Sequence, residues 1–450
     1  MSAIFGILDM SGADVEPQSL NSMRQEMATW GPDRSAIWID RGIGLGQLLL
    51  FNTPEAVREK LPREGSDGSF MLTAEARINN REDLFRELNV DPGERSELTD
   101  SQLIERAYLR WGCTCPDHFP GDWSFAIWDR RDQKLFLARD HHGNTSFYYY
   151  QDADYFAFAS SKAALLALPR VPRRLNELRI SQTLVSWSAH GPETEYSGVM
   201  RLPPAHAMVV TRDKVDVWRY WYLKETPEVR LKSDDDYVER FLEIYTEAVR
   251  FRLRSHFPVA ASLSGGLDSG SVCALAAREL RAEGQRLAVY SFVPIFDTRE
   301  VVGPGRFGDE SAYISVTSRQ AGNIDVNYIE ARDVTPLDGV HEMLAAHDAA
   351  GHAAVNYFWI AEILQSCTAT GSWNSLDRSV WECQRFVDWA KGFTRFLRST
   401  ARRLYLPRAE TQPPTCYCPR MASPSRSRET SAGCTPQQFS TMACLFGHSS

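Results

Sequence analysis

The most constraining feature of this sequence is a glycine loop between an apolar segment and a helix-forming segment. The loop reads Ser264-Gly265-Gly266-Leu267-Asp268-Ser269. Residues 257–263 before it are short and apolar, which predicts a buried strand, and residues 271–280 after it are rich in helix formers. Asp268 or Ser269 is placed to cap that helix. Paired glycines allow a ligand to approach the backbone, and a helix start presents unpaired N–H groups and a positive dipole. The sequence therefore predicts an anion site, for which phosphate is the usual occupant.

This loop differs from two common phosphate-binding loops. No Gly-Lys-Ser/Thr follows its glycines, as a Walker A motif requires, and the third glycine of a dinucleotide fingerprint is missing. Residues 264–269 instead resemble the pyrophosphate loop of ATP pyrophosphatases that activate a substrate by adenylation. Within that group the loop is most similar to that of the asparagine synthetase family. A structural Gly-Gly turn, in which Asp268 only caps the helix, is the alternative interpretation.

The resemblance implies that the loop binds ATP and Mg²⁺. Backbone N–H and hydroxyl groups would hold the pyrophosphate part of ATP, from Ser264, Gly265, Gly266 and Ser269. Asp268 is the candidate catalytic residue and Mg²⁺ ligand, because a carboxylate suits a hard cation that bridges phosphates. Leu263 and Val293 would flank the adenine. A substrate carboxylate would attack the α-phosphorus of ATP, and an amine would then displace AMP from the acyl-adenylate to form an amide.

The chain around this loop alternates between strand and helix patterns. Strands are expected at residues 287–293 and 326–329, and helices are expected to begin near residues 233, 309 and 336. This alternation predicts an α/β domain with a parallel sheet, helices on both faces and ligands at the carboxyl ends of the strands. The resemblance implies that the fold is adenine nucleotide α-hydrolase-like.

Two further groups of residues in this half have open interpretations. Asp309 and Glu310 match a recurring acidic pair of the family, and they either cap a helix or act directly in the site. His352, Asn356 and Tyr357 lie where the substrate pockets of the family lie, although packing or surface positions account for them as well.

The chain before residue 220 contains short apolar strands with a few amphipathic helices between them. This pattern predicts an α+β domain of stacked antiparallel sheets covered by helices. It resembles the class II glutamine amidotransferase domain of the same family, which is Ntn-hydrolase-like. The resemblance is carried by residues 121–129, 137–143, 156–160, 201–206 and 220–221.

The glutaminase chemistry of that domain is expected to be lost here. Active members expose an N-terminal cysteine whose α-amine serves as base, whereas this chain has Ser2. The glutamate that should bind the α-ammonium of glutamine aligns with Arg77, and two like charges repel. The arginine expected around residues 44–49, to grip the α-carboxylate, is also missing. We therefore predict an inactive amidotransferase-like domain. A glutaminase that uses Ser2 as nucleophile is the alternative.

The sequence departs from the family pattern after residue 370. The second acidic loop and the catalytic lysine of the family have no match, and Ser, Arg and Pro dominate without helical or strand periodicity. We expect a tail that is disordered or read in a shifted frame. The expected organisation is an amidotransferase-like domain at residues 1–220, an incomplete ATP-pyrophosphatase domain at 230–370 and an irregular tail at 371–450.

Composition limits the partners that this chain is expected to have. It carries 58 acidic against 50 basic side chains, a net charge of −8, which argues against a nucleic-acid-binding surface. Stretches of about eighteen apolar residues and a basic N-terminal segment are both missing, so we expect no membrane span, no signal peptide and a cytoplasmic location. The nine cysteines lack the spacing of a zinc site. The expected partner is a small-molecule or peptide carboxylate substrate.

Three functions remain open at the level of sequence. With an inactive amidotransferase half, the chain resembles β-lactam synthetases and lasso-peptide macrolactam cyclases, which take the amine from the substrate itself. Ammonia-independent lactam formation is therefore the first expectation. A glutamine-hydrolysing asparagine synthetase that uses Ser2 is the second. A catalytically impaired remnant that acts only as a binding protein is the third.

Overall fold

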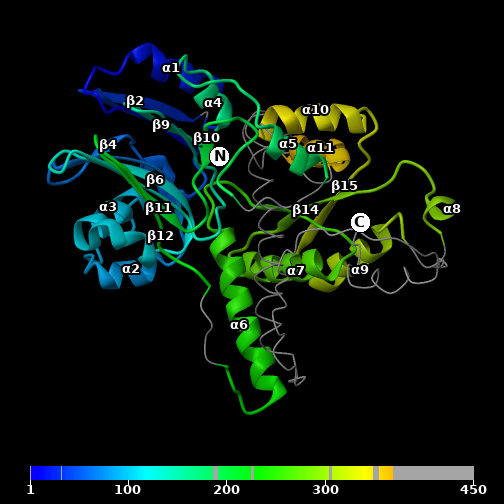
Figure 1. Ribbon diagram of the computed structural model, residues 1–450. Helices are drawn as coiled ribbons and strands as arrows, with labels where there is room; N and C mark the ends of the chain where they lie inside the picture. The colour runs from blue at the N-terminus through cyan, green and yellow to red at the C-terminus, as the bar shows by residue number, and fades with distance from the viewer. Residues whose placement is uncertain are drawn as a thin grey trace, which may run out of the picture. The chain divides into compact units, whose positions relative to one another are not determined.

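In the computed structural model, two six-stranded antiparallel sheets make up the first half of the chain (Figure 1). The first sheet has the order β10-β8-β9-β1-β3-β2 and the second has the order β12-β11-β7-β6-β5-β4. The structure describes residues 2–31, 33–185, 191–223, 228–303, 307–347 and 354–367. Within these ranges, no helix combines the length and the apolar character that a membrane crossing requires.

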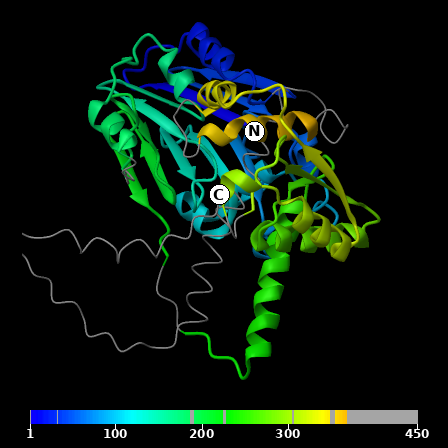
Figure 2. The same cartoon turned by 90° about the vertical axis from the view of Figure 1, so that its right-hand side faces the viewer.

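The first sheet is built around the N-terminal strand β1. Its strands are β1 (Ala3–Asp9), β2 (Arg34–Asp40), β3 (Ile43–Leu49), β8 (Tyr148–Gln151), β9 (Tyr155–Ala159) and β10 (Val199–Arg201). β1 pairs with β3 on one side and β9 on the other. A Cβ at Gly46 would lie 2.2 Å from the ring of Phe5, so a glycine is needed where that ring crosses β3. Helices α1 (Pro17–Glu26) and α4 (Lys162–Leu166) cover the outer face, and the turned view keeps the dark blue α1 on that side (Figure 2).

The second sheet is covered by helices on its own outer face. Its strands are β4 (Arg63–Glu64), β5 (Phe70–Ile78), β6 (Gly121–Asp129), β7 (Lys134–Arg139), β11 (His206–Val210) and β12 (Val215–Arg219). The elements beside it are η1 (Pro54–Arg58), α2 (Arg81–Glu87), α3 (Asp100–Trp111) and η2 (Gly112–His118). The remaining described helix of this half, α5 (Glu177–Leu184), has no buried residue. Side chains of β6 alternate between two cores: Phe125 faces the helices, and Ala126 faces the first sheet. The predicted α+β domain of stacked antiparallel sheets is confirmed.

The second half contains a three-stranded parallel sheet with the order β13-β14-β15. The strands are β13 (Ala260–Ser262), β14 (Leu287–Phe292) and β15 (Ile324–Ile329). The helices are α6 (Asp234–Leu253), α7 (Leu267–Ala282), α8 (Arg299–Val302), α9 (Ser311–Ala321), α10 (Pro336–His347), η3 (Ala354–Asn356) and α11 (Tyr357–Cys367). Val289 packs in the core that contains α7, and Tyr290 packs on the opposite face with α11. The predicted α/β domain with helices on both faces is confirmed (Figure 1).

The long helix α6 begins where the sequence predicts it. Ser233 and Asp236 form a capping box, in which each side chain accepts a hydrogen bond from the other residue's backbone N–H. Its apolar side chains are covered only in the second half of the helix: Tyr245 and Val249 are buried, whereas Val238 is 57% exposed.

Candidate functional site

The predicted nucleotide loop lies at the carboxyl end of β13 and is fixed to the neighbouring strand β14. The N–H of Leu263 donates to the carbonyl of Tyr290 at 3.1 Å, which extends the parallel pairing by one residue. The buried hydroxyl of Ser291 donates to the carbonyl of Leu263 at 2.7 Å. Ligands bind at this edge in open α/β sheets, because the strand ends and helix starts meet there. The loop therefore has the location that the sequence predicts.

The serine hydroxyls of the loop converge on its backbone. Ser269 Oγ accepts from the N–H of Ser264 at 3.0 Å and lies 2.7 Å from Ser264 Oγ. Ser264 Oγ also accepts from the N–H of Gly266, at 3.3 Å. The expectation that Asp268 or Ser269 caps α7 is wrong: Gly266 is the N-cap residue, and both side chains lie in the first turn of the helix. The structure thus brings Ser264, Gly266 and Ser269 together at a solvent-facing loop.

Gly265 approaches the start of helix α9 closely. A Cβ at this position would lie 3.1 Å from the Cβ atoms of both Glu310 and Tyr313. The N–H of Gly265 donates to Glu310 Oε2 at 2.9 Å. The close packing requires a residue without a side chain, so Gly265 is explained by a neighbouring helix as well as by a ligand.

The two acids at the start of α9 have different contacts, one of them local to the helix and the other to the nucleotide loop. Asp309 accepts from the N–H of Ser311 at 2.9 Å, which is a local contact at the start of the helix. Glu310 makes no capping bond to its own helix and binds the nucleotide loop instead. Sequence reasoning did not find this contact, because 45 residues separate its two partners.

The remaining predicted nucleotide residues occupy different environments. Asp268 is exposed in the first turn of α7, which suits a single carboxylate that holds Mg²⁺ together with phosphate oxygens. Among the described residues, no group of three or more His, Cys, Asp or Glu side chains could hold a metal ion alone. Leu263 is buried in the core, with 1% of its surface exposed. Val293 extends β14, and its N–H donates to the carbonyl of Ile329 at 2.9 Å.

The described cysteines are buried or partly buried thiols. Burial raises the pKa of Cys273 to about 12 and also raises the pKa values of Cys113 and Cys115. Thiolates are the forms that bind metals and attack substrates. These three cysteines are therefore structural at neutral pH.

The predicted substrate-pocket residues Asn356 and Tyr357 lie where η3 meets α11. Asn356 ends η3, and Tyr357 begins α11 and is buried. His352 and the tail at residues 371–450 lie outside the described residues.

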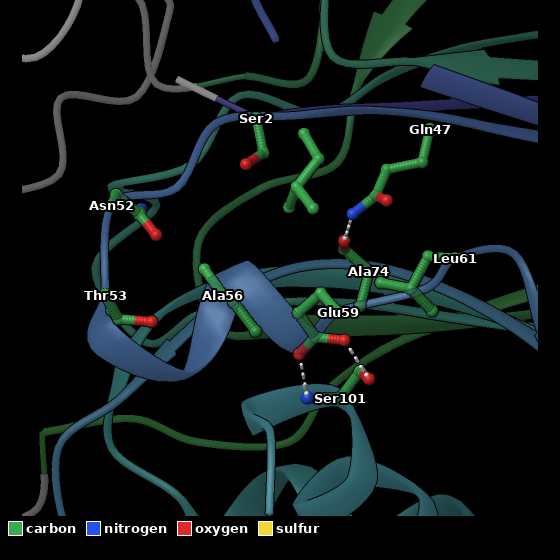
Figure 3. Close-up of a pocket in the computed structure, with 11 residues that line it drawn as sticks. Ser2, Gln47, Asn52, Thr53, Ala56, Glu59, Leu61, Ala74 and Ser101 are labelled. Atoms are coloured by element: carbon green, nitrogen blue, oxygen red, sulfur yellow. Dashed lines mark hydrogen bonds between the residues drawn. The ribbon is translucent and has the colours of Figure 1, made fainter. Parts of the chain in front are cut away.

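Ser2 lies beside a small cavity in the first half of the chain (Figure 3). Its hydroxyl accepts from the N–H of Leu50 at 3.0 Å and donates to the carbonyl of the same residue at 3.4 Å. The cavity volume is about 10 Å³, which is about the room that one water molecule needs. A glutamine side chain therefore does not fit this cavity as it stands.

As far as the structure describes them, the walls of this cavity contain no arginine, lysine or histidine that could pair with an α-carboxylate. Leu49, from the strand in which an arginine was expected, lines the cavity together with Ala76 and Leu61. The carboxylate of Glu59 accepts from the N–H of Ser101 at 2.9 Å and from its hydroxyl at 2.5 Å (Figure 3). Burial raises the pKa of Glu59 above its ordinary value. The described lining thus offers polar side chains such as Asn52 and Thr53 to any carboxylate that entered, but it offers no cation and places the acid Glu59 beside them.

Arg77 has structural contacts that the sequence did not predict. It is not among the residues that line the cavity with Ser2. Its Nη2 donates to three backbone carbonyls at the end of α6: those of Phe251 at 2.7 Å, Arg252 at 2.9 Å and Arg254 at 2.9 Å. A cation at a helix C-terminus satisfies carbonyls that have no partner within the helix.

Two arginines from the end of α6 make the reciprocal contacts. Arg252 forms a bidentate ion pair with the buried Asp122. Arg254 donates to Glu55 at 2.6 Å and to Asp100 at 3.1 Å. Sequence reasoning missed this cluster, although the closely spaced arginines at residues 250, 252 and 254 were a visible signal.

Comparisons with known proteins divide the chain at the same place as the fold. Residues 1–221 match the family model of the glutamine amidotransferase domain, and residues 240–369 match that of asparagine synthase. Asparagine synthetase [glutamine-hydrolyzing] 3 of Bacillus subtilis is 30% identical over 288 residues, which are 63% of this chain and 47% of that protein. Amidase chry2 of Gibberella zeae is 26% identical over 60% of this chain and 40% of its own length.

The chain spans about half the length of the curated relatives that it matches. A putative asparagine synthetase [glutamine-hydrolyzing] 2 of Methanocaldococcus jannaschii is 27% identical over 60% of this chain and 56% of its own length. Among solved structures, a glutamine phosphoribosylpyrophosphate amidotransferase of B. subtilis is 11% identical, with a TM-score of 0.36, over 78% of this chain and 91% of that chain.

Proposed function

We propose that this chain, which belongs to the asparagine synthetase family, is an ATP-dependent ligase that activates a carboxylate as an acyl-adenylate. One observation carries the proposal. Two hydroxyls and the N–H groups of two glycines converge at the start of α7, on the carboxyl edge of a parallel sheet. Such a helix start favours anions through its dipole and through N–H groups that have no partner within the helix.

The residues of the loop have separable tasks in this reaction. Ser264, Ser269 and the glycine N–H groups bind the β- and γ-phosphates and hold the α-phosphorus toward the substrate. Asp268 is the residue that would hold Mg²⁺, and the bound ion would neutralise charge on the pyrophosphate. A carboxylate oxygen of the substrate attacks the α-phosphorus, and the bond to the β-phosphate oxygen breaks. An amine then attacks the acyl carbon, loses a proton, and AMP leaves.

The Ser2 cavity supports an amine that comes from the substrate rather than from glutamine. The cavity has a volume of about 10 Å³, its described lining contains no cation that could pair with the α-carboxylate of glutamine, and it contains the acid Glu59. An ammonia-independent reaction, in which one small molecule or peptide supplies both the carboxylate and the amine, needs no glutaminase. Lactam or macrolactam formation is therefore the favoured reaction, and a small-molecule or peptide carboxylate is the favoured substrate.

Asparagine synthesis from glutamine is the second candidate. The similarity to the glutamine-hydrolysing asparagine synthetases of B. subtilis and M. jannaschii favours it, and Ser2 lies beside a cavity. Release of glutamate from glutamine, lost in Ser2→Ala, would support it. The third candidate, a binding protein without catalysis, predicts ATP binding without any exchange of pyrophosphate.

Calorimetry of ATP binding and ATP–pyrophosphate exchange test the ligase. With Mg²⁺ present, we expect the full chain to bind ATP, and Asp268→Asn to lower carboxylate-dependent exchange by about a hundredfold or more. Asp325→Asn is the matched control. Asp325 lies on β15, is exposed like Asp268, and pairs with Arg286 rather than with the nucleotide loop. L-aspartate is the first carboxylate to test, since exchange that depends on it would favour the asparagine-forming candidate. Failure of the full chain to bind ATP at millimolar concentration would refute the assignment.

A further inference from the structure

One loop amide that a phosphate would need is already bound to a carboxylate. We propose that Glu310 is an anionic placeholder on the nucleotide loop, which competes with the phosphates of ATP for the N–H of Gly265. The inference rests on the proposed function, because it concerns the same loop. It adds a residue that sets the affinity of the loop for the nucleotide by occupying one of its N–H groups while the nucleotide is absent.

The geometry separates Glu310 from an ordinary helix cap. Glu310 is the N-cap residue of α9, yet its side chain makes no hydrogen bond to its own helix. Asp309 makes the local contact at that end, to the N–H of Ser311 at 2.9 Å. The carboxylate of Glu310 is directed instead to the N–H of Gly265, also at 2.9 Å. Formation of α9 therefore does not require the contact with the loop.

The chemistry of the acceptor makes Glu310 different from the other partners of the loop. The N–H groups of Ser264 and Gly266 are bound to serine hydroxyls, which can rotate and donate to a phosphate oxygen. An ionised carboxylate accepts hydrogen bonds but cannot donate one. A phosphate oxygen at Gly265 would meet a second anion at hydrogen-bond distance, and the two would repel. The carboxylate must leave before that N–H can bind the nucleotide.

The absence of a side chain at Gly265 explains why the placeholder fits so closely. A Cβ on Gly265 would lie 3.1 Å from the Cβ of Glu310, so the two backbones are already near their limit of approach. The loop therefore keeps an anion-binding shape without a bound nucleotide. The release step is a rotation of the Glu310 side chain, with no movement of α9.

The test compares two neighbouring acids by calorimetry of ATP and of inorganic pyrophosphate, with Mg²⁺ and the full chain. Glu310→Gln keeps the size of the side chain and removes its charge. We expect it to bind both ligands about tenfold more tightly, which is the size of one charge-assisted hydrogen bond that no longer competes. Asp309→Asn removes the same charge one residue away, and we expect its affinities to stay within about twofold of the wild type.

The outcomes are distinguishable from a failure of the proposed function. If the wild type binds ATP and Glu310→Gln binds it equally or more weakly, Glu310 positions the loop and the placeholder is refuted. An equal gain of affinity in Glu310→Gln and Asp309→Asn would mean that only the net charge near the loop matters, and this would also refute the placeholder. If none of the three proteins binds either ligand, the proposed function fails together with this inference. Circular dichroism and thermal unfolding of each variant show that the comparison is between folded proteins.

Discussion

Arg77 Nη2 lies 2.9 Å from the backbone oxygen of Arg254, a contact between residues 177 positions apart in the chain. The same nitrogen also binds the carbonyls of Phe251 and Arg252. These carbonyls end α6, where the backbone has no further helical N–H to pair with. A residue that aligns with a substrate-binding position is therefore a structural link between two distant segments.

Loss of this link should be measurable as a loss of stability. We expect Arg77→Gln to lower the free energy of unfolding by about 2–3 kcal/mol, since hydrogen bonds from a charged donor contribute about 1.5–3 kcal/mol. Urea denaturation followed by fluorescence measures the change. The control is Arg86→Gln, because Arg86 forms an exposed ion pair with Asp83 on α2 and should contribute less than about 1 kcal/mol. Equal effects of the two substitutions would contradict the structural role of Arg77.

The two glycines of the loop should respond differently to the same substitution. Gly265→Ala places a Cβ 3.1 Å from Glu310 and Tyr313, whereas the nearest atom to a Cβ at Gly266 is Ser264 Oγ at 3.4 Å. We expect Gly265→Ala to lower the free energy of unfolding by about 1–3 kcal/mol through overpacking. Gly266→Ala meets no such contact and should lower it by less than about 1 kcal/mol, through the poorer capping by alanine alone. Denaturation of both variants in urea is the measurement, and the reverse order would show that α9 does not constrain the loop.

The buried acid Glu59 should make stability depend on pH. Burial raises its pKa above the ordinary value of 4.5, so the folded state holds this proton more tightly than the unfolded state. As the pH rises from 4.5 through the raised pKa, the contribution of Glu59 to stability falls. Glu59→Gln carries no such proton. The stability of the wild type relative to this variant should therefore decrease as the pH rises through that range, as measured by thermal unfolding. A difference that is constant with pH would contradict the assignment.

The Ser2 cavity should not hydrolyse glutamine even with a better nucleophile. A thiol at this position would still face a volume of about 10 Å³ and the carboxylate of Glu59. We expect neither the wild type nor Ser2→Cys to release glutamate from glutamine above the rate without protein. A coupled glutamate assay checks this. Glutamate release by the wild type that disappears in Ser2→Ala would overturn the expectation and favour the glutamine-using candidate.

Apolar runs in the sequence indicate several of the buried strands. The runs at residues 70–73, 123–128, 135–138 and 155–159 all lie within β5, β6, β7 and β9. Strands β2 and β12 were not predicted, because both are edge strands with partly exposed side chains, which weakens the pattern. Residues 264–266 and 269 could be predicted as one site since they are close in sequence. The partner Glu310 could not, because only the packing of α9 brings it to the loop.

The direction of Arg77 could have been derived from the strand that carries it. Successive side chains of a strand point to opposite faces, so Arg77 lies on the same face of β5 as Thr73 and on the face opposite to Ala74 and Ala76. The hydroxyl of Thr73 donates to the carbonyl of Gly46, so this face of β5 is directed toward the first sheet. An alignment gives the position of a residue along the chain, and alternation along β5 is needed to give its direction.

The contacts of Arg77, Arg252 and Arg254 at the end of α6 link the evolution of the two halves of the chain. Natural selection on the stability of α6 also acts on Asp100, Asp122 and Arg77, which belong to the first half of the chain. The first half would therefore be retained for its stabilising contacts with α6 even after it had lost glutaminase activity. Deletion of the first half would remove Arg77 from the carbonyls at the end of α6 and would remove the acidic partners of Arg252 and Arg254.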